Sequence, residues 1–354
     1  MKVLQVTKPG EYTILDLPVP RPGPDEVLVR VLAVTTCPQW DLHLRHNEPM
    51  FVGHSFHYPY TPGQPGHEAT GEIAAVGAGV TGFAVGDRVS AWRDPGHDRQ
   101  GCYAQYVLMK ADHVIKVPGG FPAHELAPVE LAMCVGTVFR MLASMGAVKG
   151  TRFGVSGLGP AGLIAAQMAR AEGAAEVIGF DITPGRRALA LEQGLVDAAL
   201  DPREDGGDVA GLRHTARALD SAIDCVGSKA SVHFLMDRTR DSVALFGVQR
   251  EPFTFDVRHY LGLRLCGYKG HSKESAEYAV RLIERGELRL GLLSSRFLPL
   301  ESYGEGVDLL ERQEALKICF LPWDEEGAGN APSDVSGMNG GSAESKGSGG
   351  GEAR

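Results

Sequence analysis

Residues 35–44, TTCPQWDLHL, hold a cysteine, an aspartate and a histidine within one short run. Thiolate, carboxylate and imidazole groups bind transition metals, and the last two also move protons in enzymes. The run follows an apolar stretch of strand character. Cys37 is therefore either a metal ligand or a buried thiol that packs as a small hydrophobic residue. The run alone leaves both interpretations open.

A second chemical signal is the glycine-rich turn SGLGPAG at residues 156–162, which has G-x-G-x-x-G spacing. It follows an apolar stretch typical of a buried strand and opens an amphipathic helical stretch. In that context the glycines permit a tight turn and the approach of a pyrophosphate, while the first N–H groups of the helix face the phosphates. We predict a dinucleotide site at Gly157, Gly159, Pro160, Ala161 and Gly162.

Asp181 ends the next predicted strand, and its position favours NAD over NADP as the dinucleotide. A carboxylate there accepts hydrogen bonds from the adenosine ribose hydroxyls and repels a 2′-phosphate. An alternative role is to open the following helix, but Thr183 before Pro184 is the better helix cap. We predict further cofactor contacts at the ends of the following elements, from Arg186, Val226, Gly247 and Val248.

The secondary-structure pattern of the elements that position these residues changes along the chain. Short strand-like stretches between Gly and Pro turns run to about residue 124, which is an all-β pattern. Strands and helical stretches then alternate, which predicts a parallel, doubly wound sheet and an α/β fold. The tail is rich in Gly, Ser and acidic residues, with too little apolar surface to order it. The predicted segments are 1–124, 125–267, 268–323 and a disordered 324–354.

The composition narrows the functional classes. A formal net charge of −9 without a basic stripe argues against nucleic acid as a partner. No apolar run approaches the ~20 residues of a membrane span, and no secretion signal is recognisable, so we expect no membrane association. The six cysteines are scattered without a C-x-x-C pair, which suits a reducing cytoplasm.

Residues 62–89, PGQPGHEATGEIAAVGAGVTGFAVGDRV, resemble the medium-chain dehydrogenase/reductase family, in particular its zinc-type alcohol and polyol dehydrogenases. The stretches SGLGPAGLIAAQMAR, AIDCVG and RLIERGELRL also resemble that family in order and spacing, so the resemblance covers residues 1–323. It implies a mainly β GroES-like catalytic domain, built from 1–124 and 268–323, and a Rossmann domain at 125–267. It further implies oxidation of a small alcohol or polyol, or reduction of a carbonyl compound, in a homodimer or homotetramer.

The resemblance also implies one catalytic zinc, with His67 of the G-H-E motif and Cys37 as ligands. The third family ligand is a cysteine, or in polyol relatives a glutamate, near the start of a later helix. Counting forward through ELAPVELAMC favours Cys134, although counting back from Thr137 gives Met133. Glu130 is less favoured because it lies a full turn away. Glu68, next to His67, is a further candidate ligand or supporting group.

The remaining catalytic assignments follow from the same resemblance. His43 matches the relay histidine of the alcohol dehydrogenases, and the usual relay serine or threonine is replaced by Gln39. We therefore assign proton transfer to His43 or water, with Asp41 and Glu68 as further catalytic residues. Thr137 is expected to face the nicotinamide.

The lobe that carries a structural zinc in many relatives is short here and has only Cys102, so we expect no second zinc. Two other hypotheses for the function stay open. One is a zinc-free quinone or enone reductase of the same fold. The other is a non-catalytic nucleotide-binding paralogue.

Overall fold

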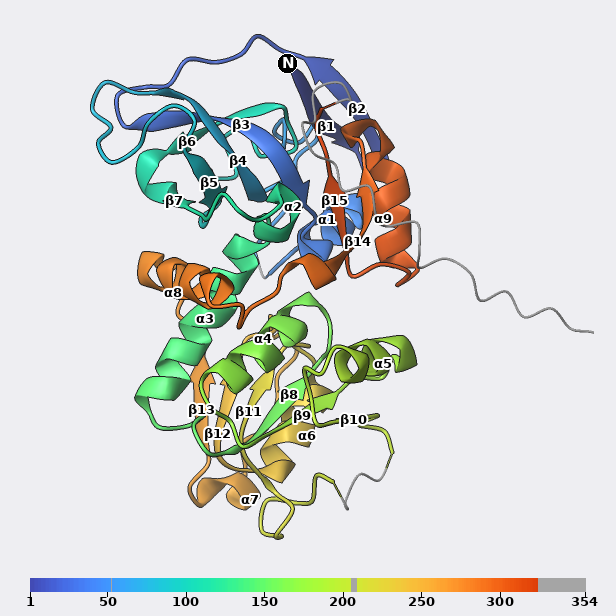
Figure 1. Ribbon diagram of the computed structural model, residues 1–354. Helices are drawn as coiled ribbons and strands as arrows, with labels where there is room; N and C mark the ends of the chain where they lie inside the picture. The colour runs from blue at the N-terminus through green and yellow to red at the C-terminus, as the bar shows by residue number, and fades with distance from the viewer. Residues whose placement is uncertain (52, 205–208, 324–354) are drawn as a thin grey trace, which may run out of the picture. The chain divides into compact units, whose positions relative to one another are not determined.

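The computed structural model describes residues 1–51, 53–204 and 209–323 (Figure 1). The segment 324–354, predicted to be a disordered tail, lies outside these residues. A seven-stranded sheet runs in the order β14-β15-β3-β4-β5-β7, with β6 paired to β3, and a separate hairpin joins β1 to β2. The strands are β1 (Lys2–Lys8), β2 (Glu11–Asp16), β3 (Glu26–Thr35), β4 (Glu68–Val76), β5 (Arg88–Ala91), β6 (Tyr106–Lys110), β7 (Val114–Lys116), β14 (Ser294–Leu298) and β15 (Lys317–Phe320).

The second sheet is wholly parallel and runs in the order β10-β9-β8-β11-β12-β13. This is the Rossmann order, whose direction reverses between β8 and β11 and leaves a cofactor crevice at the carboxyl ends of these strands. The predicted α/β class, with a doubly wound parallel sheet and a mainly β domain, is confirmed. The strands are β8 (Arg152–Ser156), β9 (Glu176–Phe180), β10 (Ala198–Leu200), β11 (Leu219–Asp224), β12 (Thr239–Leu245) and β13 (Arg264–Gly267).

Helices cover both faces of the parallel sheet, because neighbouring residues of a strand point to opposite faces. Val177 packs in a core with α3, α4 and α8, whereas Ile178 packs in a separate core with α6. The helices are α1 (Pro38–His46), α2 (Ala123–Leu126), α3 (Val129–Ser144), α4 (Pro160–Ala171), α5 (Pro184–Glu192), α6 (Lys229–Arg238), α7 (Val257–Tyr260), α8 (Lys273–Glu284) and α9 (Tyr303–Glu311).

Strands β14 and β15 from the end of the chain join the sheet of the N-terminal strands, so β15 lies directly beside β3. The chain from Met1 to Pro322 forms one compact unit. The domain limits near residues 124 and 267 therefore stay a prediction.

One expectation about apolar stretches is corrected. The stretch Ala123–Ser144, which contains α2 and α3, is long and apolar enough to cross a membrane by length and composition. Of its most apolar window, 78% is buried inside the fold, as expected for the central helix of a packed core. The same helix carries the buried carboxylate of Glu130.

Candidate metal and cofactor sites

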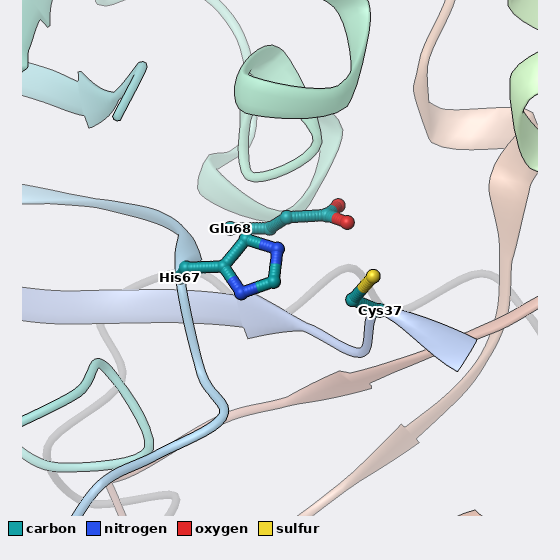
Figure 2. Close-up of side chains that lie close together, drawn as sticks. All are labelled: Cys37, His67 and Glu68. Atoms are coloured by element: carbon teal, nitrogen blue, oxygen red, sulfur yellow. The ribbon is translucent and has the colours of Figure 1, made fainter. Parts of the chain in front are cut away.

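Cys37, His67 and Glu68 form one group because β3 and β4 are antiparallel partners. Thr35 lies opposite Glu68 in the register, so the residues just beyond the end of β3 meet those at the start of β4. One ligand atom from each side chain lies within 4.8 Å of the others. Figure 2 shows the Cys37 sulfur and the His67 ring turned toward each other. The structure therefore brings together three of the four predicted ligands.

The hydrogen bonding of His67 leaves one ring nitrogen available to a metal. Its Nδ1 lies 2.7 Å from the carbonyl oxygen of Pro65, which can only accept. Nδ1 therefore carries a hydrogen, and Nε2 is the ring nitrogen that faces the group and could bind a metal once its own proton is lost, as in metal-bound histidines. Burial alone lowers the pKa of His67, but Cys37 and the carboxylates of Glu130 and Glu68 raise it well above its ordinary value. This surplus of negative charge fits a divalent cation.

The structure places the favoured third ligand, Cys134, in a different group from Cys37 and His67. Glu130 Oε2 lies 3.8 Å from His67 Nε2, while Cys134 belongs to a second group with Glu130 and His271. Cys134 lies one turn beyond Glu130 on the same face of α3 and donates from Sγ to Glu130 Oε1 at 3.3 Å. Burial and the neighbouring Glu130 raise the pKa of Cys134 well above its ordinary value. Glu130, one turn before Cys134, is thus the residue of α3 whose carboxylate approaches His67, and the identity of the third ligand stays a prediction.

Glu68 is engaged by a buried cation that the sequence interpretation did not identify. Lys317 Nζ lies 2.6 Å from each carboxylate oxygen, and Thr35 Oγ1 donates to Oε2 at 2.9 Å. Both charged side chains are 1% exposed. With both oxygens occupied, Glu68 holds its place beside His67 rather than exchanging protons with a substrate, so its catalytic assignment is not favoured. A lone lysine inside the apolar run LKICF was the available signal.

Replacing Lys317 by Met should lower the free energy of unfolding by about 3–5 kcal/mol, because it leaves the Glu68 charge buried without a partner. Adding Glu68→Gln should restore most of the loss. The measurement is urea unfolding of the metal-free protein. Lys116→Met is the control, since that lysine is 55% exposed in its pair with Asp87 and should change stability by less than about 1 kcal/mol. A loss below 1 kcal/mol for Lys317→Met would contradict the expectation.

Asp41, predicted to be catalytic, is enclosed by tyrosine side chains in the structure. Its side chain is buried, and its carboxylate accepts hydrogen bonds from Tyr103 Oη at 2.9 and 3.0 Å and from Tyr303 Oη at 2.9 Å. These contacts tie α1 to α9 and to the segment before β6. The catalytic assignment of Asp41 stays a prediction.

The pKa of Asp41 is raised to about 6 by burial, although the tyrosine hydrogen bonds oppose the shift. The folded state therefore binds a proton that the unfolded state releases near pH 3.8. This contribution to stability is fully present below about pH 4 and is lost as the pH rises through 6, a change of roughly 3 kcal/mol.

We therefore expect the stability of the wild type to fall relative to Asp41→Asn as the pH rises from 4 to 7. Urea unfolding at stepped pH tests this, with Asp112→Asn, at a side chain that is 78% exposed, as the control. A stability difference that does not vary with pH would show that Asp41 is not protonated in the folded protein.

His43 lies outside the group of Cys37, His67 and Glu68. Its Nδ1 lies 3.0 Å from the carbonyl oxygen of Glu48, in the turn that ends α1. The hydroxyl of Thr137 donates to the carbonyl of Met133 at 3.1 Å within α3. The relay role of His43 and the nicotinamide contact of Thr137 stay predictions.

The glycine-rich turn has the geometry expected of a dinucleotide loop. Gly157 has φ +85°, and a Cβ on Gly162 would run into the carbonyl oxygen of Gly157. Gly159 is the N-cap of α4, and Pro160 is its first residue, as predicted. These glycines are therefore required by backbone conformation and by close approach of helix and strand.

Asp181 faces this turn. Its Oδ2 accepts from the N–H of Leu158 and its Oδ1 accepts from the N–H of Thr183, both at 2.8 Å. Arg186 Nη1 lies 3.8 Å from Oδ2. The carboxylate thus sits at the carboxyl edge of the sheet between the glycine turn and α5.

The next two strands end at the same edge. The backbones of Gly227 and Gly247 lie so close together that a Cβ on either residue would collide with the backbone of the other loop. The side chains of Val226 and Val248 are 51% and 42% exposed there. Asp224 fixes the loop after β11 by accepting from the N–H groups of Val226 and Gly227, a role that the sequence interpretation missed.

The comparisons with known proteins agree with this geometry. Residues 23–119 match the alcohol dehydrogenase GroES-like domain, and residues 160–285 match the zinc-binding dehydrogenase domain. The chain is 27% identical to L-threonine 3-dehydrogenase of Bacillus licheniformis, over 91% of this chain and 99% of the relative. It is 25% identical to sorbitol dehydrogenase of Halalkalibacterium halodurans, over 92% and 100%.

A solved structure described as a zinc-binding dehydrogenase of Sinorhizobium meliloti, bound to NADP, has a TM-score of 0.75 and 25% identity, over 91% of this chain and 99% of that one. Both domain models, the relatives and the fold indicate the same family. The chain belongs to the zinc-type alcohol and polyol dehydrogenases of the medium-chain dehydrogenase/reductase family.

Proposed function

We propose that the protein oxidises an alcohol or polyol, or reduces the corresponding carbonyl compound, with NAD and one zinc ion held by Cys37, His67 and Glu130. The observation that carries the metal assignment is the orientation of His67, whose Nδ1 is held by a backbone carbonyl oxygen while Nε2 faces a thiol and a carboxylate. Bound zinc supplies a Lewis acid that lowers the pKa of a hydroxyl group, and bound NAD accepts the hydride.

The charges of the donor set support this assignment. A thiolate, a carboxylate and a neutral imidazole together balance a divalent cation. Glu68 is paired with Lys317, so its charge does not depend on the ion for balance. Three protein donors would leave a fourth position for a substrate hydroxyl, as a catalytic zinc site requires.

His43 is proposed to carry the proton. With Nδ1 facing the Glu48 carbonyl oxygen, Nε2 is the nitrogen left to accept it. A carbonyl oxygen that fixes one nitrogen of the ring sets the tautomer of the other. Asp41 is proposed to hold α1, which carries His43, in place through its contacts with Tyr103 and Tyr303 rather than to move a proton itself.

The test is metal analysis of the purified protein, combined with binding of NAD and NADP measured side by side. We expect about one zinc per chain and tighter binding of NAD. Zinc-free protein with full turnover would instead indicate a quinone or enone reductase. A second zinc that resists chelators would contradict the expectation of a single site.

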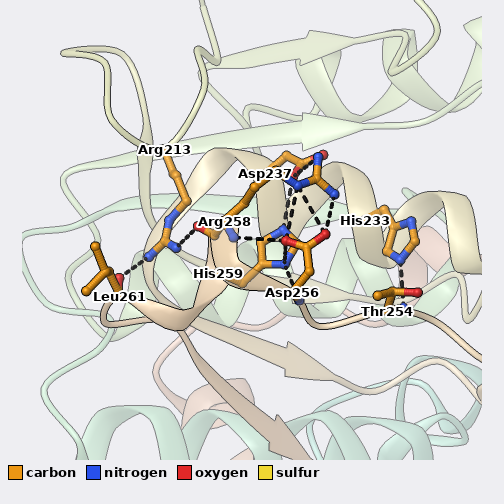
Figure 3. A network of polar contacts seen from close by, with 8 residues as sticks. All are labelled: Arg213, His233, Asp237, Thr254, Asp256, Arg258, His259 and Leu261. Carbon is orange, nitrogen blue, oxygen red and sulfur yellow. Dashed lines mark hydrogen bonds and ion pairs between the residues drawn. The ribbon is translucent and has the colours of Figure 1, made fainter.

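A second copy of the chain is proposed to cover the edge of the parallel sheet at β13, which has no neighbouring strand on its outer side among the described residues. Beside this edge, α7 and the next residue expose three apolar side chains, Val257, Tyr260 and Leu261, at 82%, 74% and 71%. Figure 3 shows the hydrogen bonds and ion pairs around this turn. His259 is buried between Asp237 and Asp256, and Arg213 donates to the carbonyl oxygens of Arg258 and Leu261.

An exposed apolar surface near a strand that forms the edge of the described sheet favours symmetric pairing of identical chains. Tyr260→Glu is therefore expected to shift the molar mass in solution from that of a dimer or tetramer toward a smaller species. Light scattering coupled to size exclusion is the measurement. Val85→Glu, at an apolar side chain that is 66% exposed elsewhere, should leave the mass unchanged. An unchanged mass for Tyr260→Glu would place the subunit interface on another face.

A further inference from the structure

The two oxygens of Glu130 have different surroundings. Oε2 faces His67 Nε2 at 3.8 Å. Oε1 accepts from His271 Nε2 at 2.8 Å and from Cys134 Sγ at 3.3 Å. The carboxylate is 7% exposed, so water does not compete strongly for either oxygen. One oxygen is held by the protein, and the other is left for a ligand on the side of His67 and Cys37.

We propose that His271 is a positioning residue for the metal site, which holds Oε1 of Glu130 so that Oε2 alone is presented to zinc. This rests on the proposed function, in which Glu130 is a zinc ligand. A carboxylate free to rotate would alternate between one-oxygen and two-oxygen contact with the ion. Hydrogen bonds to the outer oxygen remove this freedom and tune ligand strength.

The place of His271 in the chain suits such a role. It directly precedes Ser272, which caps α8 by accepting from the N–H of Ser275. Helix α8 packs closely on α3, where a Cβ on Gly136 would lie 3.1 Å from the Tyr278 ring. The donor and the acceptor are therefore carried by two helices that are locked together, which fixes the distance between them.

A second contact supports the same oxygen. Tyr268 Oη donates to Cys134 Sγ at 3.0 Å, and the Cys134 thiol donates in turn to Oε1 of Glu130. The Tyr268 ring packs edge-on against the Phe246 ring, with the ring centroids 5.6 Å apart. Phe246 directly precedes Gly247, which is predicted to contact the cofactor. The outer side of Glu130 is therefore built from the segment that follows the last strand of the nucleotide-binding sheet.

The experiment compares zinc affinity and the visible spectrum of the cobalt-substituted protein in four forms. These are the wild type, His271→Ala, His271→Gln and a control, His233→Ala, whose ring accepts a backbone N–H far along the chain. The His271 side chain is 32% exposed, so its removal leaves no closed cavity. Competition with a chromogenic chelator gives the zinc affinity, and melting of the metal-free forms checks that each one is folded.

We expect His271→Ala to weaken zinc binding by about 10–100-fold and to shift the cobalt absorption bands. His271→Gln should restore most of both, because its amide N–H can reach the same oxygen. The His233 control should match the wild type. A folded His271→Ala with unchanged affinity and spectrum would overturn the positioning role.

Two further outcomes are distinguishable. A wild type that binds no zinc would refute the proposed function itself, whatever His271 does. A wild type that binds two zinc ions, one of which is lost in His271→Ala, would make His271 a ligand of its own site with Cys134 and overturn the positioning role.

Discussion

Glu130→Gln is expected to remove zinc from the protein and to lower kcat/KM for the best alcohol substrate at least about 10³-fold, or about 4 kcal/mol at 1.36 kcal/mol per decade. The amide keeps the shape of the side chain but removes the charge that faces His67 Nε2. Cys37→Ser and His67→Ala should have the same effect, because each removes one of the three donors. The measurements are zinc content after dialysis and steady-state kinetics.

Cys134→Ser is the discriminating variant. If Glu130 is the ligand, the serine hydroxyl can still donate to Oε1, and both zinc and turnover should survive. If Cys134 is the ligand, this variant loses zinc and Glu130→Gln retains it. Cys319→Ser is the control for loss of a buried thiol, since Cys319 lies in the core outside both donor groups.

The parts of the site that were predictable from the sequence are those fixed by local pattern. The glycine turn and Asp181 belong to one strand-turn-helix unit, where spacing determines geometry. Cys37 and His67 each follow or precede a strand of recognisable pattern, and antiparallel pairing of those strands then brings them together. Local periodicity carries this information without knowledge of the tertiary structure.

The parts that were missed depend on long-range packing or on the phase of a helix. α3 begins only at Val129, after the separate turn of α2, so its phase could not be counted from neighbouring motifs, and the approach of Glu130 to His67 was not identified. Lys317 reaches Glu68 from 249 residues away, through the pairing of β15 with β3. His271 meets Glu130 because α8 packs on α3, which no sequence spacing indicates.

The coenzyme preference is the second large effect. The wild type should prefer NAD over NADP at least ~100-fold in kcat/KM, or about 2.7 kcal/mol. Each oxygen of Asp181 already accepts one backbone N–H, and a carboxylate oxygen has a second lone pair for a ribose hydroxyl. A 2′-phosphate in the same place would put like charges together in a partly desolvated site, which costs several kcal/mol.

Asp181→Ser should reduce this preference through opposite changes in the activities with NAD and NADP. Activity with NAD should fall, because the ribose loses its acceptor and Leu158 loses the carboxylate that anchors the glycine turn. Activity with NADP should rise, because Arg186, now 3.8 Å from Asp181, is freed to face the phosphate. Adding Arg186→Ala to Asp181→Ser should therefore cancel the gain with NADP without restoring NAD.

Asp201→Ser is the matched control for this pair of measurements. Asp201 is 6% exposed, as is Asp181, and it directly follows β10, the strand next to β9. Its carboxylate is paired with Arg187 and Arg203 and makes no contact with the glycine turn, so the NAD to NADP ratio should not change. Equal use of both coenzymes by the wild type, or an unchanged ratio in Asp181→Ser, would reduce Asp181 to the residue that opens α5 through its bond from the N–H of Thr183. The adenosine ribose would then have to bind elsewhere on this edge of the sheet.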